Sequence, residues 1–267
     1  MNQAERRRFL IEALLQERPE YRDAAIPATP EGQKLLLRGL MNIRDAKACS
    51  AEFLRVQDEY LRAEIAARGI TDVDSLTPVQ PSLYLWQGDI TTLRCDAIVN
   101  AANSGMTGCY VPNHRCIDNA IHTFAGVALR CRCAEIMAAQ GHPEPTGHAK
   151  ITPAYNLPCR FVLHTVGPIV SGRVTARDQA LLADCYRSCL TLAAENGLES
   201  VAFCCISTGE FHFPNELAAQ IAIETVRSFL VTPSSIKKVI FNVFKDSDKA
   251  IYERLLRGTD AAEAGAR

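Results

Sequence analysis

Apolar residues in the first quarter of the chain recur at the spacing of amphipathic α-helices. Leu10 and Leu14 fall on one face of a first helix, and a second helix is predicted in TPEGQKLLLRGLMNI. Thr29 and Ser50 stand where the N-caps of the second and third helices belong. We therefore expect residues 1–75 to form a helical N-terminal extension.

From Ser82 onward, short apolar runs alternate with amphipathic stretches. The apolar runs are typical of strands and read SLYLWQ, CDAIVNAA, HAKITPAY, RFVLHTVG, SVAFCCIS and KKVIFNVF. Amphipathic helices are predicted over 176–196, 214–230 and 247–258. Repeated strand–helix order predicts a largely parallel sheet with helices on both faces. We expect an α/β domain over 76–258 and a frayed tail over 259–267.

Composition narrows the class of protein. The chain has 267 residues, 48% of them hydrophobic, and a formal net charge of −1, so it can bury a large core and shows no basic surface for nucleic acid. No apolar run approaches the roughly 18 residues that span a bilayer, and the N-terminus lacks a signal-peptide segment. Eleven cysteines in mainly apolar contexts suit a reducing compartment. We predict a cytoplasmic protein that binds neither nucleic acid nor membrane.

Polar and small residues gather where the predicted strands end, which is where such sheets bind ligands. Asp89 follows one strand, and its carboxylate suits an exocyclic amine, although a turn aspartate is the commoner role. Asn100 and Asn103 offer amide donors and acceptors at the next strand end, or are turn residues in left-handed conformation. The loop ISTGEFHFP precedes a helix, which suits a phosphate group, although an ordinary turn is the alternative.

The stretch GCYVPNHRC brings together Cys109, His114 and Cys116. Thiolates and imidazoles bind zinc, with four protein ligands in structural sites and three plus an open position in catalytic ones. The alternative is a pair of incidental cysteines without a metal. Candidates for a fourth ligand are His122, Cys131 and Cys133.

Asp118 comes two residues after Cys116, at the start of a predicted helix. An acidic residue in the first turn of a helix commonly serves the helix dipole. The alternative is that its carboxylate faces the cleft beside the metal.

The segments QGDITTLRCDAIVNAAN, LHTVGP and ISTGEFHFP occur in the order found in macrodomains, so residues 82–258 resemble this ADP-ribose-binding family. In place of the usual glycine-rich run after NAAN stands MTGCYVPNHRCIDNAIH. This insertion is similar to the zinc-dependent macrodomains, which carry an N-terminal helical extension and hydrolyse ADP-ribose from modified proteins. The resemblance implies a three-layer α/β/α fold with a mixed, mostly parallel sheet.

The resemblance also implies roles for individual residues. Asp89 would bind the adenine amino group with Ile90 beside it, and Phe244 would pack on the adenine ring. Asn103 would contact the distal ribose and act in catalysis together with Asp118. The diphosphate would be wrapped by Ser207, Thr208, Gly209, Glu210 and Phe211, and one zinc ion per chain would be held by Cys109, His114 and Cys116.

The implied reaction is hydrolysis at the anomeric carbon of the distal ribose, with the ADP-ribose joined to an Asp or Glu side chain. The implied partners are ADP-ribose and mono-ADP-ribosylated protein, and a lipoyl-carrier protein is a candidate. One alternative is a reader module that binds ADP-ribose without cleaving it and uses a structural zinc. Another is that the N-terminal helices dock a partner by themselves.

Overall fold

The computed structural model describes residues 1–258, and the tail expected over 259–267 lies outside them. Within the described part, no helix is long and apolar enough to cross a membrane. The elements follow one another as α1 (Gln3–Gln16), α2 (Pro30–Ile43), α3 (Ala51–Ala67), β1 (Thr71–Asp72), β2 (Leu83–Gln87), β3 (Leu93–Arg94), β4 (Ala97–Ala102), α4 (Ile117–Ala125), α5 (Val127–Gln140), β5 (Ala149–Pro153), β6 (Phe161–Val166), α6 (Ala176–Glu195), β7 (Ser200–Phe203), α7 (Asn215–Leu230), β8 (Lys238–Val243) and α8 (Asp246–Gly258).

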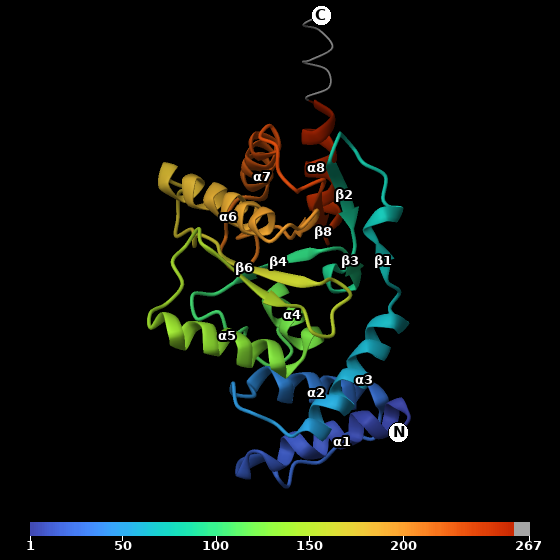
Figure 1. The fold of residues 1–267 in the computed structure, drawn as a ribbon. Coiled ribbons are helices and arrows are strands. Elements are labelled where there is room, and N and C mark those ends of the chain that lie inside the picture. Colours follow the sequence, from blue (N-terminus) through green and yellow to red (C-terminus); the bar gives the residue numbers. More distant parts are fainter. Residues whose placement is uncertain (259–267) are drawn as a thin grey trace, which may run out of the picture.

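Over residues 1–258, the main sheet has six strands in the order β2-β8-β7-β4-β6-β5. Neighbouring strands are parallel except β5, which runs antiparallel to β6. Helices α6, α7 and α8 cover one face of this sheet, and α4 and α5 cover the other (Figure 1). The fold is therefore the predicted three-layer α/β/α arrangement with a mixed, mostly parallel sheet.

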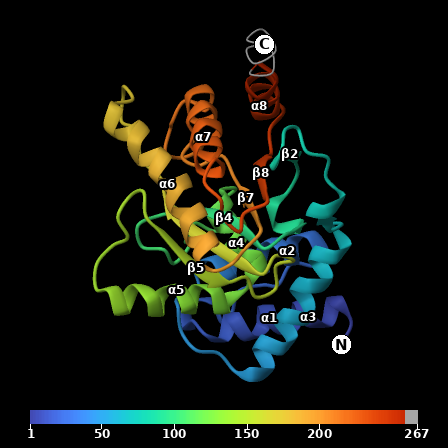
Figure 2. The same ribbon diagram turned by 45° about the horizontal axis from the view of Figure 1, so that its top comes forward.

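Helices α1 to α3 pack against α4 and α5 on the side away from the sheet (Figures 1 and 2). The predicted caps are present, because Thr29 accepts the N–H of Gly32 and Ser50 accepts that of Phe53. The apolar faces of the three helices form their own core, which also takes in Val127 of α5. The extension is thus joined to the α/β domain through its apolar core.

Two differences from the predicted bounds bear on the site. Strand β7 ends at Phe203, so the predicted strand residues Cys204 and Cys205 lie beyond it. Helix α7 begins at Asn215, with Pro214 as its N-cap and not its first residue. Both corrections lengthen the loop between β7 and α7, which carries the predicted phosphate site.

Candidate functional site

Four neighbouring parallel strands, β2, β8, β7 and β4, end at one edge of the sheet. The predicted ligand residues follow these ends directly. They are Asp89 and Ile90 after β2, Phe244 after β8, residues 207–211 after β7, and Asn103 after β4. Residues that are far apart in the sequence therefore form one row along the edge of the sheet.

Asp89 is held at one end of this row. Its Oδ1 accepts the N–H and the hydroxyl of Thr91 at 2.9 and 2.6 Å, which makes it the cap of a short turn as one prediction had it. Its Oδ2 pairs with Arg68, the residue that follows α3. Ile90 is buried, whereas Phe244 is 76% exposed. The carboxylate is fixed in place, and an exposed aromatic ring follows the neighbouring strand.

The loop after β7 suits an anion. Ser207 and His212 have left-handed φ angles of +63° and +56°, and the N–H of Phe213 closes the loop onto the carbonyl of Ser207 at 3.0 Å. In the described part of the chain, the N–H groups of residues 209–211 have no acceptor. Helix α7 begins directly after the loop, and no side chain caps its first turn. Free N–H groups beside a helix N-terminus are a typical phosphate-binding arrangement.

Asp118 on α4 points into the protein at the end of β4. Its Oδ1 accepts from Nδ2 of Asn100 at 2.8 Å, and its Oδ2 accepts from Nδ2 of Asn103 at 3.3 Å. Burial raises the pKa of Asp118 to about 6, while the two amides act in the opposite direction. Neither asparagine has a positive φ angle, so the left-handed turn alternative is wrong for both. Asp118 lies in the first turn of α4, as the sequence indicates, and its carboxylate is buried between the amides of Asn100 and Asn103.

His164 on β6, which was not among the predicted site residues, lies next to Asn100. Nδ2 of Asn100 lies 3.1 Å from its Nδ1, and the Thr152 hydroxyl lies 2.9 Å from its Nε2. Burial lowers the pKa of His164 to about 3, so the ring is neutral. Donor atoms of His122, Cys133 and His164 lie within 4.8 Å of one another. Because both nitrogens of His164 are engaged in hydrogen bonds, we assign this cluster to the core.

Cys109, His114 and Cys116 converge as predicted, with their donor atoms within 4.8 Å of one another. Cys109 Sγ lies 3.6 Å from His114 Nδ1, and a tetrahedral zinc with ordinary bond lengths would separate these atoms by about 3.6 Å. Burial, with a smaller contribution from the neighbouring Cys109, raises the pKa of Cys116 to about 12, so a bound cation would be needed to keep this sulfur as a thiolate. The donor set fits zinc. No fourth His, Cys, Asp or Glu joins the group within residues 1–258.

The imidazole of His114 also reaches the loop after β7. Its Nε2 lies 3.5 Å from Glu210 Oε1, on the side of the ring opposite Cys109. Metal-binding histidines commonly present their second nitrogen to a carboxylate. The Glu210 side chain thus faces His114, while its main-chain N–H stays free for a ligand. The loop that carries Cys109, His114 and Cys116 therefore lies beside the predicted phosphate loop.

Three residues of the extension reach this site, and none was predicted from the sequence to do so. They are Arg38 and Asn42 on α2 and Arg68 after α3. A signal for the first two was present, since they are polar residues four positions apart in the otherwise apolar run LLLRGLMNI.

An α/β/α sheet with ligand loops along one strand-end edge defines a ligand-binding domain of the open α/β class. A family model described as Macro domain matches residues 99–222. The chain is 59% identical over 260 residues to a protein-ADP-ribose hydrolase of Treponema medium, covering 96% of this chain and all of that one. It is 49% identical to a protein-ADP-ribose hydrolase of Staphylococcus aureus (strain MSSA476), covering 92% of each.

A solved macrodomain of Trypanosoma brucei in complex with ADP-ribose is also similar. Its TM-score is 0.64 at 30% identity, and the match covers 86% of this chain and 97% of that one. The chain belongs to the macrodomain family, in the group whose bacterial relatives bear the name protein-ADP-ribose hydrolase.

Proposed function

We propose that this protein is a zinc-dependent hydrolase that releases ADP-ribose from mono-ADP-ribosylated Asp or Glu side chains. The observation that carries the proposal is that the predicted ribose contacts, Asn103 and Asp118, adjoin the group of Cys109, His114 and Cys116. Nδ2 of Asn103 donates to Gly108, the neighbour of Cys109, at 3.1 Å and also to Asp118. The predicted sugar contacts therefore adjoin the Cys–His–Cys group. Mono-ADP-ribosylated protein is the proposed substrate, and a lipoyl-carrier protein is one candidate.

The order of the residues along the row matches the order of the groups along ADP-ribose. Adenine would lie against Asp89 and Ile90, with the Phe244 ring available for stacking. The free N–H groups of residues 209–211 would receive the diphosphate, so no lysine cluster is needed. The distal ribose would then reach Asn103. Binding along the whole row anchors the ligand far from the bond that breaks.

In the proposed reaction, the bond between the anomeric carbon and the ester oxygen breaks, and positive charge develops on the ribose. The carboxylate of the modified side chain leaves with the bonding electrons. Water adds to the anomeric carbon, and Asp118 accepts its proton. Asn103 orients the ribose. When bound, zinc supplies Lewis acidity and a fixed point for the sugar, although two thiolates offset its charge and favour positioning.

The test combines metal content with turnover. Elemental analysis of protein prepared without chelator should give about one zinc per chain, and release of free ADP-ribose from a mono-ADP-ribosylated protein should stop on chelation. Cys109→Ala should lose both zinc and release, whereas Cys49→Ala, a matched half-buried cysteine outside the group, should keep both. Release that persists without zinc would contradict the metal. Tight ADP-ribose binding without any release would identify a reader module instead.

A further inference from the structure

The metal loop, residues 108–116, rests on helix α2 of the N-terminal extension. Nη2 of Arg38 donates to the carbonyl of His114 at 3.0 Å. The same guanidinium donates twice to Asn119 Oδ1, at 2.8 and 3.2 Å. A planar guanidinium with two fixed acceptors holds a defined geometry, which a flexible ammonium does not. Arg38 thus ties the main chain of His114 to α2.

Asn42 lies one helical turn further along the same face of α2. Its Oδ1 accepts the N–H of Asn113 at 2.9 Å, and its Nδ2 donates to the hydroxyl of Thr123 at 3.0 Å. Asn42 is only 1% exposed, so these bonds are shielded from water. Asn113 has a left-handed φ of +57°, which asparagine tolerates better than most residues. Arg38 and Asn42 therefore form hydrogen bonds with the main chain of adjacent loop residues, His114 and Asn113.

Asn119 links Arg38 to the second cysteine of the loop. Its Oδ1 accepts the hydrogen bonds of Arg38, and its Nδ2 donates to the carbonyl of Val111 at 3.1 Å. Its own N–H donates to Sγ of Cys116 at 3.4 Å. Asn119 thus connects α2 to the loop at Val111 through its side chain and at Cys116 through its main-chain N–H.

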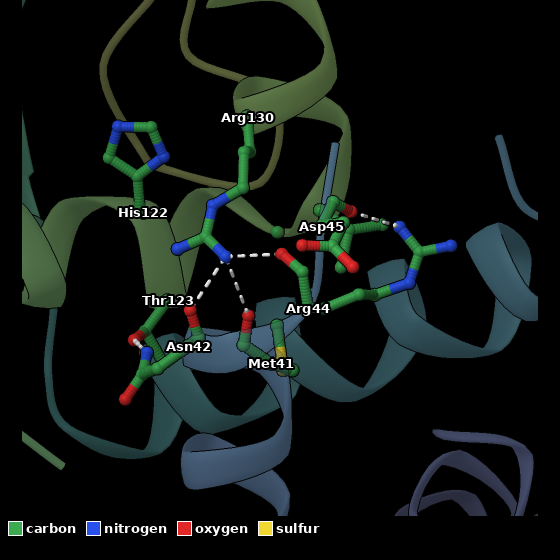
Figure 3. A pocket seen from close by; sticks show the side chains of 9 residues that line it. Met41, Asn42, Arg44, Asp45, His122, Thr123 and Arg130 are labelled. Carbon is green, nitrogen blue, oxygen red and sulfur yellow. Dashed lines mark hydrogen bonds between the residues drawn. The ribbon is translucent and has the colours of Figure 1, made fainter. Parts of the chain in front are cut away.

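Helix α2 is itself anchored to the α/β domain. Figure 3 shows the guanidinium of Arg130, on α5, reaching the last carbonyls of α2 and the residue after it. The acceptors are Met41 at 3.3 Å, Asn42 at 2.6 Å and Arg44 at 2.5 Å. The same guanidinium lies 4.2 Å from the ring centre of Tyr110 in the metal loop. Helix α2, helix α5 and the loop form one hydrogen-bonded unit.

We propose that α2 is a positioning element for the metal loop, in which Arg38 and Asn42 hold the main chain of residues 113 and 114 so that His114 meets the two thiolates. This inference rests on the proposed zinc site. It gives the extension a function in the site, beyond covering α4 and α5. Partners outside the ligand shell typically contribute 10- to 100-fold to metal affinity because they orient the ligands.

Zinc affinity, measured by competition with a chromophoric chelator, tests the proposal on the full chain. Arg38→Ala and Asn42→Ala should each weaken zinc binding by about 10- to 100-fold and speed zinc loss to excess chelator. Arg38→Lys should recover only part of the affinity, since one ammonium cannot serve both acceptors in the same way. Arg6→Ala is the control, because Arg6 pairs with Glu59 inside the extension and makes no hydrogen bond to the loop. Melting temperatures of all variants are recorded alongside.

The outcomes are distinct. Weaker zinc binding in the α2 variants, with the affinity of Arg6→Ala unchanged, supports the proposal. If Arg38→Ala binds zinc as tightly as the wild type does, the positioning role is overturned, but the zinc site itself is not. Equal weakening in Arg38→Ala and Arg6→Ala also overturns it, because general destabilisation would then explain the loss. Wild-type protein without zinc removes the proposed metal and this inference with it.

Discussion

At the scale of single residues, two amides near the end of β4, those of Asn100 and Asn103, fix the carboxylate of Asp118 by hydrogen bonds. The amide group of Asn100 has two hydrogens, and these point to Asp118 and to the neutral ring of His164. The amide of Asn103, the second of the two, donates to the other carboxylate oxygen of Asp118. A carboxylate fixed at both oxygens presents its remaining lone pairs in set directions. This geometry suits a group that must orient or deprotonate one water molecule.

Replacing Asp118 by Asn tests that role. The amide is similar in size but accepts no proton, so release of ADP-ribose should fall by on the order of 10²- to 10⁴-fold. The affinity for ADP-ribose, measured by calorimetry, should stay close to that of the wild type, because the adenine and diphosphate contacts are unchanged and only a hydrogen bond of Asn103 is altered. Undiminished release would assign the carboxylate a purely structural task.

At the scale of elements, the sequence predicts most of the fold because its signals are local. The caps Thr29 and Ser50 and the apolar strand runs each specify an element without help from the rest of the chain. Strand β7 was predicted too long because Cys204 is as apolar as the strand and is buried, although it lies in the loop. The pattern of apolar residues reflects burial alone. A buried loop residue and a buried strand residue therefore cannot be told apart from the sequence.

The candidate site follows the same rule. Cys109, His114 and Cys116 were found because they are close in sequence, and the row of ligand residues because strand ends gather at one edge. Arg68 was missed because its partner Asp89 is brought to it only by the packing of α3 against the α/β domain. Contacts between distant elements leave little trace in a single sequence.

Arg68 also gives a prediction for the end of α3. It pairs with Asp89, donates to the Thr91 hydroxyl at 3.2 Å and lies 4.2 Å from the ring centre of Phe124. Because a partly exposed ion pair contributes about 0.2–1 kcal/mol, Arg68→Ala should weaken ADP-ribose binding by up to about fivefold. Ribose 5-phosphate, which lacks adenine, should bind as before.

The control for this variant is Arg55→Ala, within α3, whose side chain pairs with Glu59. Calorimetry with both ligands compares the two variants. Tighter binding of ADP-ribose by Arg68→Ala would mean that Arg68 competes with adenine for the Asp89 carboxylate, and would reverse the assignment.

At the scale of the whole molecule, binding and stability are assigned to opposite edges of the sheet. The ligand row occupies the carboxyl ends of the strands. At their amino ends, Asp96 accepts the N–H groups of Glu199 and Ser200 at 2.9 and 3.0 Å. It also pairs with Arg160 at 2.9 Å, and its carbonyl receives the N–H of Phe161. One residue thereby joins the starts of β4, β6 and β7.

This arrangement predicts a pH-dependent contribution to stability. Burial alone would raise the pKa of Asp96, but the N–H groups of Glu199 and Ser200 together with Arg160 lower it below its usual value. The charged form is therefore favoured by folding, and its contribution is complete above the unfolded pKa near 4 and is lost as the pH falls through the lower folded pKa. Asp96→Asn should cost about 1–3 kcal/mol of unfolding free energy at neutral pH.

Urea unfolding of wild type and Asp96→Asn, from neutral pH down to about pH 3, measures this difference. The gap between the two proteins should be constant at neutral pH and narrow below about pH 4, because only the wild type then loses a charge at this position. ADP-ribose affinity at neutral pH should be equal in both, since the substitution lies at the edge away from the ligand row. A gap that does not change with pH would mean that Asp96 acts through its shape and not through its charge.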